Sequence, residues 1–210
     1  MSIKFYSIVF MLLWGYLAGS IPFGYLIGRF NGIDIRKYGS HNIGATNVTR
    51  VLGIANGRFC FLLDFLKGVI PVLLIGYGFG GKSPIGPAWS GVLVAIGCVL
   101  GHMYPCWLNF KGGKGVATSI GALIALSFSP VIIALLVWWF VYQKTKIVSL
   151  ASLATAGTTP VAALVLTLLG WSRTHWTIIV LMFLIGAIIF WRHRENIERL
   201  RKGTENKFKK

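Results

Sequence analysis

The stretch GVATSIGALIALSFSPVIIALLVWWFVYQ, residues 115–143, decides how often this chain crosses a membrane. It contains no charged residue and is 29 residues long. As one helix it would measure about 43 Å, which is long for a single span. Ser127-Phe128-Ser129-Pro130 interrupts it near the middle, and a proline after polar residues is typical of a turn. The stretch is therefore either one long span or a hairpin of two short ones.

The composition around this stretch is that of an integral membrane protein. Of the 210 residues, 55% are hydrophobic and only 12% are charged, whereas soluble domains carry about 25% charged residues. The charges are also unbalanced, with 21 Lys and Arg against 5 Asp and Glu, a net charge of +16. Such an excess suits an anionic membrane surface, a nucleic acid or an anionic substrate.

The hairpin interpretation gives seven spans and the single-helix interpretation gives six. The positive-inside rule separates them. With seven spans and the N-terminus outside, 17 of the Lys and Arg residues lie on the inner side and 3 on the outer side. With six spans the division becomes 8 against 12. The strong asymmetry favours seven.

We therefore predict one all-α membrane domain, residues 1–210, with its N-terminus outside and its C-terminus in the cytoplasm. The predicted helices are 5–28, 59–81, 84–107, 115–128, 130–143, 149–170 and 175–191, followed by a basic tail, 192–210. Within the first helix, Gly15 and Gly19 have the spacing that allows close helix packing. Asp64 and Lys67, three residues apart in the second helix, are expected to pair with each other.

Three polar segments fall on the inner side. The first, residues 39–50, contains hydroxyl and amide side chains and ends in Arg50, a combination that suits a phosphate or carboxylate. The alternative is a solvated loop whose Asn and Ser residues cap helices. The polar side chains are those of Ser40, Asn42, Thr46, Asn47 and Thr49.

The second segment is Lys111-Gly-Gly-Lys-Gly115, directly before an uncharged helix. Glycine N–H groups at a helix N-terminus can approach an anion, and Lys114 would add a full charge. The alternative is a flexible turn whose lysines only set the topology. The third segment, Arg192–Arg201, is a basic membrane-proximal stretch in which His193 and Asn196 share one helix face. Ser149 lies on the same side of the membrane.

These motifs together resemble one family. Ser40-His-Asn-Ile-Gly-Ala-Thr-Asn47 with Arg50, Gly101-His-Met-Tyr-Pro105 leading into Lys111–Gly115, and His193-Arg-Glu-Asn196 are similar to the three cytoplasmic motifs of the bacterial acyl-phosphate:glycerol-3-phosphate acyltransferases, the PlsY family. The resemblance covers residues 15–200. His41 is one departure, because the family often has glycine there.

The resemblance implies a multi-pass enzyme of the bacterial cytoplasmic (inner) membrane, with its site on the cytoplasmic face. It implies transfer of a fatty acyl group from acyl phosphate to the 1-hydroxyl of glycerol 3-phosphate, which gives lysophosphatidic acid and phosphate, an early step of phospholipid synthesis. The implied catalytic residues are Ser40, Arg50, Lys114, His193 and Asn196. The implied substrate-binding residues are Asn42, Gly44, Thr46, Asn47, Gly112, Gly113, Gly115 and Ser149. We expect membrane lipids as surroundings, and no metal, cofactor, nucleic acid or obligate protein partner.

An acyl phosphate is already activated, so no covalent nucleophile is needed. The tasks that remain are to hold two anions together and to stabilise the charge that develops. We expect Arg50 and Lys114 to hold phosphates, and His193 and Asn196 to position glycerol 3-phosphate. The hydroxyl proton would pass to His193 or to the leaving phosphate, and we favour the phosphate, which makes the catalysis substrate-assisted.

Three other functions fit the sequence less well. A thioester-dependent acyltransferase needs a His-x4-Asp pair, and His193 with Glu198 is the nearest match. A transporter for an anionic metabolite would show paired broken helices at mid-membrane. A lipid-binding scaffold would explain the basic tail but neither the glycine-rich turn nor the segment 39–50.

Overall fold

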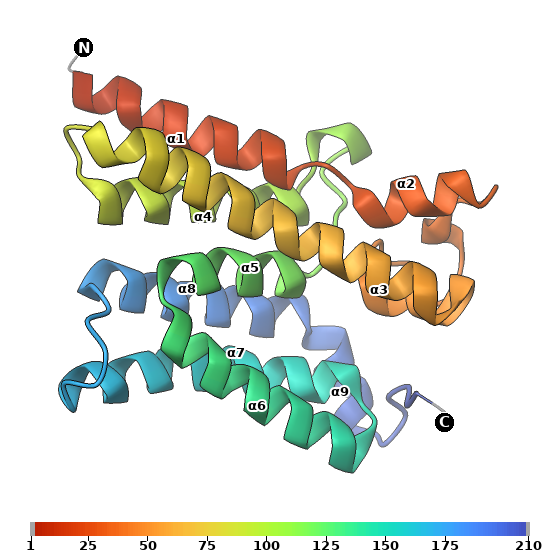
Figure 1. Ribbon diagram of the computed structural model, residues 1–210. Coiled ribbons are helices and arrows are strands. Elements are labelled where there is room, and N and C mark those ends of the chain that lie inside the picture. The colour runs from red at the N-terminus through yellow and green to blue at the C-terminus, as the bar shows by residue number, and fades with distance from the viewer. Residues whose placement is uncertain (1–2, 209–210) are drawn as a thin grey trace. The chain divides into compact units, whose positions relative to one another are not determined.

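The computed structural model describes residues 3–208, and every regular element in that range is a helix (Figure 1). Lys209 and Lys210, the end of the predicted tail, and residues 1–2 at the start of the predicted domain lie outside the described residues. The α-helices are α1 (Ile3–Gly19), α2 (Phe23–Phe30), α3 (Ala45–Pro71), α4 (Pro87–Met103), α5 (Val116–Leu126), α6 (Phe128–Thr145), α7 (Val148–Leu168), α8 (Trp176–Arg192) and α9 (Arg194–Arg201). Short turns η1 (Ile35–Lys37), η3 (Gly80–Lys82) and η4 (Cys106–Leu108) connect them, and a π-helical segment η2 (Val72–Phe79) extends α3.

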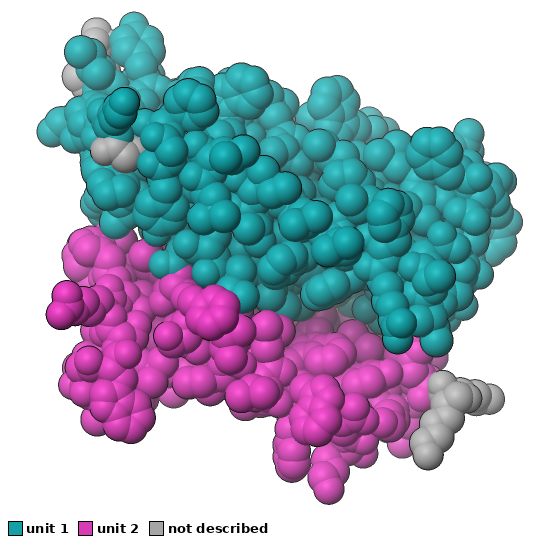
Figure 2. All heavy atoms as spheres, viewed as in Figure 1, with its two compact units in different colours: residues 1–126 teal, residues 127–210 magenta. Residues whose placement is uncertain are grey.

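The chain forms two compact units, residues 1–126 and 127–210 (Figure 2). The cut falls in the stretch that decides the number of spans. Ser127 has an extended backbone between α5 and α6, with φ −158° and ψ 107°. The predicted break is therefore confirmed, and Pro130 occupies the first turn of α6, where a proline costs no helical hydrogen bond.

In the first unit, α1 packs along α4 through interlocking glycines. A Cβ on Gly15 or Gly19 would meet the backbone of Val94 or Cys98 on α4. The expected close packing at Gly15 and Gly19 is thus confirmed. Helix α4 also has two glycines at this spacing, Gly97 and Gly101, and they pack against the backbone of α1. Gly68 of α3 and Gly121 of α5 bring those two helices together in the same way.

In the second unit, α7 packs against both α6 and α8. The hydroxyl of Thr155 on α7 donates to the carbonyl of Ala134 on α6 over 3.4 Å. The hydroxyls of Ser127 and Thr174 form a hydrogen bond of 2.7 Å, which links the start of α6 to the segment before α8.

Most predicted boundaries lie within four residues of the observed ones, and two predicted helices differ by more. The first predicted helix is divided at Ser20–Pro22, because Pro22 has no N–H to continue the helical ladder. The second predicted helix begins earlier than residue 59, since α3 starts at Ala45 and is kinked at Gly53, where the backbone is not helical (φ +86°). The prediction followed the apolar run, whereas the polar turns before it are also helical; Thr49, for example, donates its hydroxyl to the Ala45 carbonyl at 2.9 Å.

Five helical segments among the described residues are long and apolar enough to cross a membrane, and α8 joined to α9 across a 60° bend makes a sixth. Helix α5 is apolar but has only 11 residues. Large apolar side chains such as Trp14, Leu74, Trp139 and Leu184 are exposed along these helices, as contact with lipid requires. The count of seven and the side on which each terminus lies stay predictions.

Candidate active site

Asn47 organises the polar loop before α3. Its side chain is buried, and its Nδ2 donates to the carbonyls of Tyr38 (3.0 Å) and Asn42 (2.9 Å) and, at 3.3 Å, of Ile35. Its Oδ1 accepts from the backbone N–H of Ser40 at 2.8 Å. The amide thus ties four points of the loop together. Its observed contacts fix the loop, while the predicted contact with substrate stays a prediction.

The loop bends sharply around that amide. Gly39 has φ +62°, and a Cβ there would run into the Asn47 Oδ1, so only glycine fits. His41 also has a left-handed backbone, φ +56°, and its Nδ1 lies 3.0 Å from the Arg36 carbonyl. This conformation gives a physical reason for a preference for glycine at position 41.

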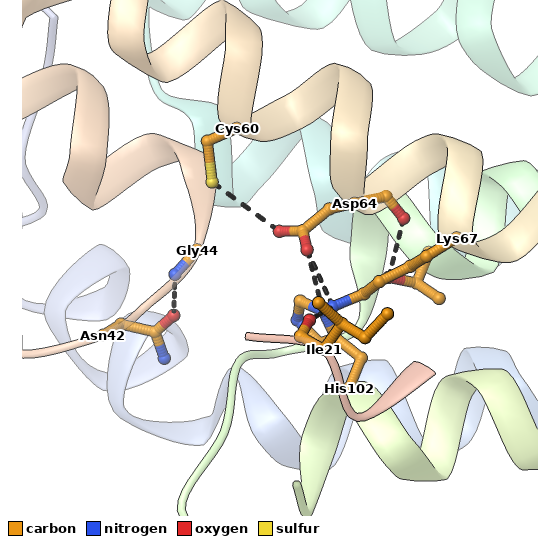
Figure 3. A network of polar contacts seen from close by, with 8 residues as sticks. Ile21, Asn42, Gly44, Cys60, Asp64, Lys67 and His102 are labelled. Atoms are coloured by element: carbon orange, nitrogen blue, oxygen red, sulfur yellow. Dashed lines mark hydrogen bonds and ion pairs between the residues drawn. The ribbon is translucent and has the colours of Figure 1, made fainter. Parts of the chain in front are cut away.

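The predicted ligand-binding residues of this segment divide by exposure. Ser40 and Arg50 are exposed, and Gly44 and Thr46 are half-buried. Asn42 accepts from the Gly44 N–H at 2.8 Å, just before α3 begins (Figure 3). The exposed pair can therefore reach a ligand, whereas the amide of Asn42, like that of Asn47, shapes the backbone.

The Lys111–Gly115 turn is folded back onto the end of α4. The N–H of Gly112 donates to the Met103 carbonyl and that of Gly113 to the His102 carbonyl, both at 3.1 Å. A Cβ on Gly113 would collide with the His102 ring. The N–H groups of these two glycines bind α4, and the absence of a side chain serves close packing; their predicted contact with a phosphate stays a prediction. Lys114 is half-buried, and Gly115, with φ +85°, turns the chain into α5.

Next to this turn, which the His102 ring contacts at Gly113, lies a buried charge cluster. Figure 3 shows the residues of the cluster. The Lys67 ammonium is 2.8 Å from the Asp64 carboxylate, as the sequence predicted, and each side chain is only 3% exposed. Lys67 also donates to the Ile21 carbonyl, at the break between α1 and α2, over 2.7 Å. His102 approaches the same carboxylate with its Nδ1 at 3.6 Å.

The cluster holds the glycine-rich turn in place. His102 contacts Asp64 through its ring and Gly113 through both its ring and its carbonyl, so His102 connects the charge pair to the turn. The Thr118 hydroxyl donates to the Asp64 carbonyl at 2.9 Å and fastens the first turns of α5 to α3. His102 is therefore a packing residue, as expected.

In the second unit, His193 lies at the bend between α8 and α9 and is buried. Its Nδ1 is 2.8 Å from the Ile189 carbonyl. A carbonyl only accepts, so Nδ1 carries the proton and Nε2 of the neutral ring is an acceptor. The sequence offered no group that orients this ring, and the structure supplies one.

Two residues that the sequence analysis did not single out complete this part of the site. Glu205 accepts from Ser149 Oγ at 2.7 Å and from Asn196 Nδ2 at 2.6 Å, so it joins two of the predicted residues. Arg199 binds the other carboxylate oxygen at 2.7 Å. The scarcity of acidic residues was the available signal, because Glu205 is one of only five in the chain.

The two units thus hold different halves of the predicted set. The first unit provides cations and hydroxyls around two tightly packed turns, and the second provides Ser149, His193 and Asn196 around a carboxylate. Among residues 3–208 no three His, Cys, Asp or Glu side chains form a group that could hold a metal ion. Glu198 is 65% exposed and pairs with Lys202, whereas His193 is buried, so the His-x4-Glu arrangement considered above does not form.

Comparisons with known proteins agree with the motifs. Residues 9–203 match the family described as glycerol-3-phosphate acyltransferase. The chain is similar to the glycerol-3-phosphate acyltransferase of Aquifex aeolicus, with 44% identity over 95% of this chain and 98% of that protein. It is equally similar, at 44% identity, to that of Shouchella clausii over 97% of both chains.

Two solved structures are similar over their whole length. Both are of PlsY (YgiH), described as an integral membrane glycerol 3-phosphate acyltransferase, one in a glycerol 3-phosphate form and one in a lysophosphatidic acid form. They share 42% sequence identity with this chain and cover 97% of it and 96% of their own length, with TM-scores of 0.84 and 0.83.

Proposed function

This chain belongs to the glycerol-3-phosphate acyltransferase family, in the PlsY branch of integral membrane enzymes, and from that premise we propose that its acyl donor is an acyl phosphate. The enzyme would transfer the fatty acyl group to the 1-hydroxyl of glycerol 3-phosphate and release phosphate and lysophosphatidic acid. The observation that carries the proposal is the full-length match to this family, with Ser40, Arg50, Lys114, Ser149, His193 and Asn196 all present.

The donor assignment is supported by the electrostatics of the chain. An acyl phosphate and glycerol 3-phosphate are both anions that must be held against their repulsion. Arg50 and Lys114 supply cations, and the few acidic residues do not offset them. A thioester donor would call for a His–carboxylate base, and Glu198 is turned to Lys202 instead.

We assign the roles as follows. Arg50, Lys114 and Ser40 bind the phosphates and stabilise the developing oxyanion. Because the N–H groups of Gly112 and Gly113 are bound to α4, the ammonium of Lys114 is the anion-binding group of that turn. Asn42, Gly44, Thr46 and Asn47 shape the loop around Ser40, and Ser149, His193 and Asn196 bind glycerol 3-phosphate.

We place proton transfer on the leaving phosphate. The Nδ1 partner of His193 is a neutral carbonyl, which stabilises an imidazolium less than a carboxylate does. The acceptor Nε2 is suited to align the attacking hydroxyl, and the departing phosphate then takes its proton. His193→Gln should chiefly raise KM for glycerol 3-phosphate. Loss of the chemical step with unchanged substrate affinity would instead make His193 the base.

The decisive experiment uses purified protein, labelled glycerol 3-phosphate and either palmitoyl phosphate or palmitoyl coenzyme A. We expect labelled lysophosphatidic acid with the acyl phosphate alone. Lys114→Ala should remove activity without unfolding the protein, and Lys111→Ala, an exposed lysine of the same turn, is the matched control. Product from the thioester alone, or from neither donor, would refute the proposal.

The site is proposed to face the cytoplasm from the bacterial inner membrane, without a cofactor or an obligate protein partner. The support is the concentration of 17 of 21 cations on one side in the seven-span topology.

A further inference from the structure

Glu205 is held in place by the backbone around it. Helix α9 ends at Arg201, and Gly203, with φ +69°, reverses the chain. The N–H of Phe208 then donates to the Lys146 carbonyl at 3.0 Å, which anchors the tail beside the start of α7. Between these two fixed points Glu205 lies with its side chain only 6% exposed. The contacts of its carboxylate are therefore part of the fold.

The carboxylate binds three donors from three places in the second unit. Ser149 in the first turn of α7 and Asn196 in α9 both donate to Oε1, at 2.7 and 2.6 Å. Arg199 donates to Oε2 at 2.7 Å and balances the charge. Hydrogen bonds to an ionised group are short and strong, so the three donors have little freedom to turn elsewhere.

The bond to Glu205 fixes the polarity that Ser149 offers to a ligand. A serine hydroxyl has one proton, and that of Ser149 is donated to Glu205, which leaves only oxygen lone pairs for a substrate. Asn196 directs one of its two N–H bonds at the same carboxylate, which fixes the orientation of its amide. Ser149 then suits groups that donate, such as alcohols.

The charge of Glu205 favours the same kind of ligand. Burial alone would raise the pKa of Glu205, but the hydrogen bonds from Ser149, Asn196 and Arg199 outweigh it and lower the pKa below its ordinary value. The group is ionised at neutral pH. A carboxylate behind Ser149 repels a phosphate and strengthens the acceptor character of the hydroxyl oxygen.

We propose that Glu205 is a positioning residue that makes Ser149 a hydrogen-bond acceptor and fixes the Asn196 amide, so that Ser149 recognises a glycerol hydroxyl of glycerol 3-phosphate and not its phosphate. The proposal rests on the proposed function for the identity of the substrate. It adds the residue that decides which end of that substrate the second unit binds.

The test compares two ligands that share a phosphate, glycerol 3-phosphate and n-propyl phosphate, which has no hydroxyl. In Glu205→Gln the new amide cannot accept from all three donors, because one of its two ends is an N–H₂ group. The Ser149 proton is then released. We expect the Kd of glycerol 3-phosphate, measured by calorimetry on the full chain in detergent, to rise about tenfold, since a site built for a hydroxyl loses its matched acceptor. The Kd of n-propyl phosphate should stay within about threefold of the wild-type value.

Glu198→Gln is the matched control. This carboxylate is on α9, is 65% exposed and pairs only with Lys202 among the described contacts. Both ligands should bind this variant as they bind the wild type. Where Glu205→Gln does not fold, Glu205→Ala with added formate tests the carboxylate, and Ser149→Ala tests whether the serine recognises the hydroxyl.

Formate supplied to Glu205→Ala should restore glycerol 3-phosphate affinity without changing that of n-propyl phosphate. Equal weakening of both ligands, or no change in either, would overturn the proposal. The binding assay needs no acyl donor. A wild-type protein that binds glycerol 3-phosphate but makes no product from acyl phosphate therefore counts against the donor assignment, and the ratio of the two Kd values still decides the role of Glu205.

Discussion

At the scale of one residue, Asn47 shows why a buried position can require an amide, which has both a hydrogen-bond donor and an acceptor. Its Nδ2 faces three carbonyls, and its Oδ1 faces an N–H. An aspartate has the same shape but offers only acceptors, so it would confront carbonyls with a negative charge. The loop that carries Ser40 depends on this difference.

Asn47→Asp should lower the free energy of unfolding by about 1–3 kcal/mol, the usual cost of buried polar groups left unpaired, and should reduce activity with it. Asn56→Asp is the control, since Asn56 makes one such bond, to the Leu52 carbonyl at 2.9 Å, and is not in the loop. Denaturant titration of both variants checks the expectation. Equal effects at the two positions would mean that the loop does not need the amide.

Glu205 gives a pH dependence whose sign follows from its lowered pKa. A carboxylate whose pKa is lower in the folded than in the unfolded protein adds stability above its unfolded pKa and loses it as pH falls through the folded value. The Tm of the wild type should therefore exceed that of Glu205→Gln at neutral pH. The difference should shrink below the ordinary glutamate pKa of 4.5 and disappear below the folded value. A difference in Tm that grows on acidification would contradict the assignment.

At the scale of helices, small residues and buried charge set the packing. Glycines on α1 and α4 face each other's backbones, and the Asp64–Lys67 pair connects α3 to the break between α1 and α2. The glycine contacts are disrupted by any added side chain, whereas the ion pair is disrupted when one of its two partners is removed. The two kinds of contact therefore predict different effects of substitution on stability.

Gly101→Ala should destabilise the first unit by about 1–3 kcal/mol, as overpacking of a tight interface does. A Cβ at this position meets the backbone of Tyr16 and Ser20, which cannot move away as a flexible side chain can. Gly157→Ala, where a Cβ would find only the Phe190 ring 4.0 Å away, should be neutral or stabilising. Thermal unfolding in detergent distinguishes the two variants. Similar Tm values would contradict the tight glycine packing between α1 and α4.

Lys67→Met leaves the Asp64 charge buried beside His102 without its ammonium and should cost about 3–5 kcal/mol. The double variant Asp64→Asn with Lys67→Met removes both charges and should recover much of that loss. Unfolding free energies of the single and double variants form a complete cycle. A double variant no more stable than Lys67→Met would show that the pair contributes packing rather than charge balance.

The elements that could be predicted from the sequence are those marked by local chemistry. Pro130 after two polar residues predicted a break near residue 129, which the structure has at Ser127, and the pair three residues apart predicted the Asp64–Lys67 contact. The start of α3 could not be predicted, because polar helical turns before an apolar run carry no hydropathy signal. The spacing of Gly97 and Gly101 can be read from the sequence, but which helix packs against them is decided by the tertiary structure.

The sequence predicted most residues of the candidate site, but it did not predict which of them contact one another. The motifs singled out Ser149 and Asn196 separately, yet their common partner, Glu205, lies in a tail whose many basic residues obscured it. For Gly112 and Gly113 the sequence predicted exposed N–H groups, whereas the fold turns them to α4. Side-chain direction and backbone pairing depend on tertiary packing, which composition and spacing do not encode.

At the scale of the whole molecule, the prediction concerns the membrane topology, which is the number of spans and the side on which each loop lies. The seven-span arrangement puts Lys82 outside and Lys207 inside, whereas six spans would put both outside. After replacement of Cys60, Cys98 and Cys106 by alanine, a single cysteine at position 82 or 207 reports its side. A membrane-impermeant maleimide added to intact cells should label position 82 and not position 207. Labelling of both positions would require six spans.

The reversal at Gly203 has a consequence for the gene as well as for the protein. A stop codon at any position from 202 to 205 would preserve every apolar span and all three sequence motifs. The product would nevertheless lack the carboxylate that orients Ser149 and Asn196, together with the stability that this carboxylate adds. Premature termination there is expected to behave as a loss-of-function allele, and the hydrophilic segment after α9 is not a neutral place for truncation.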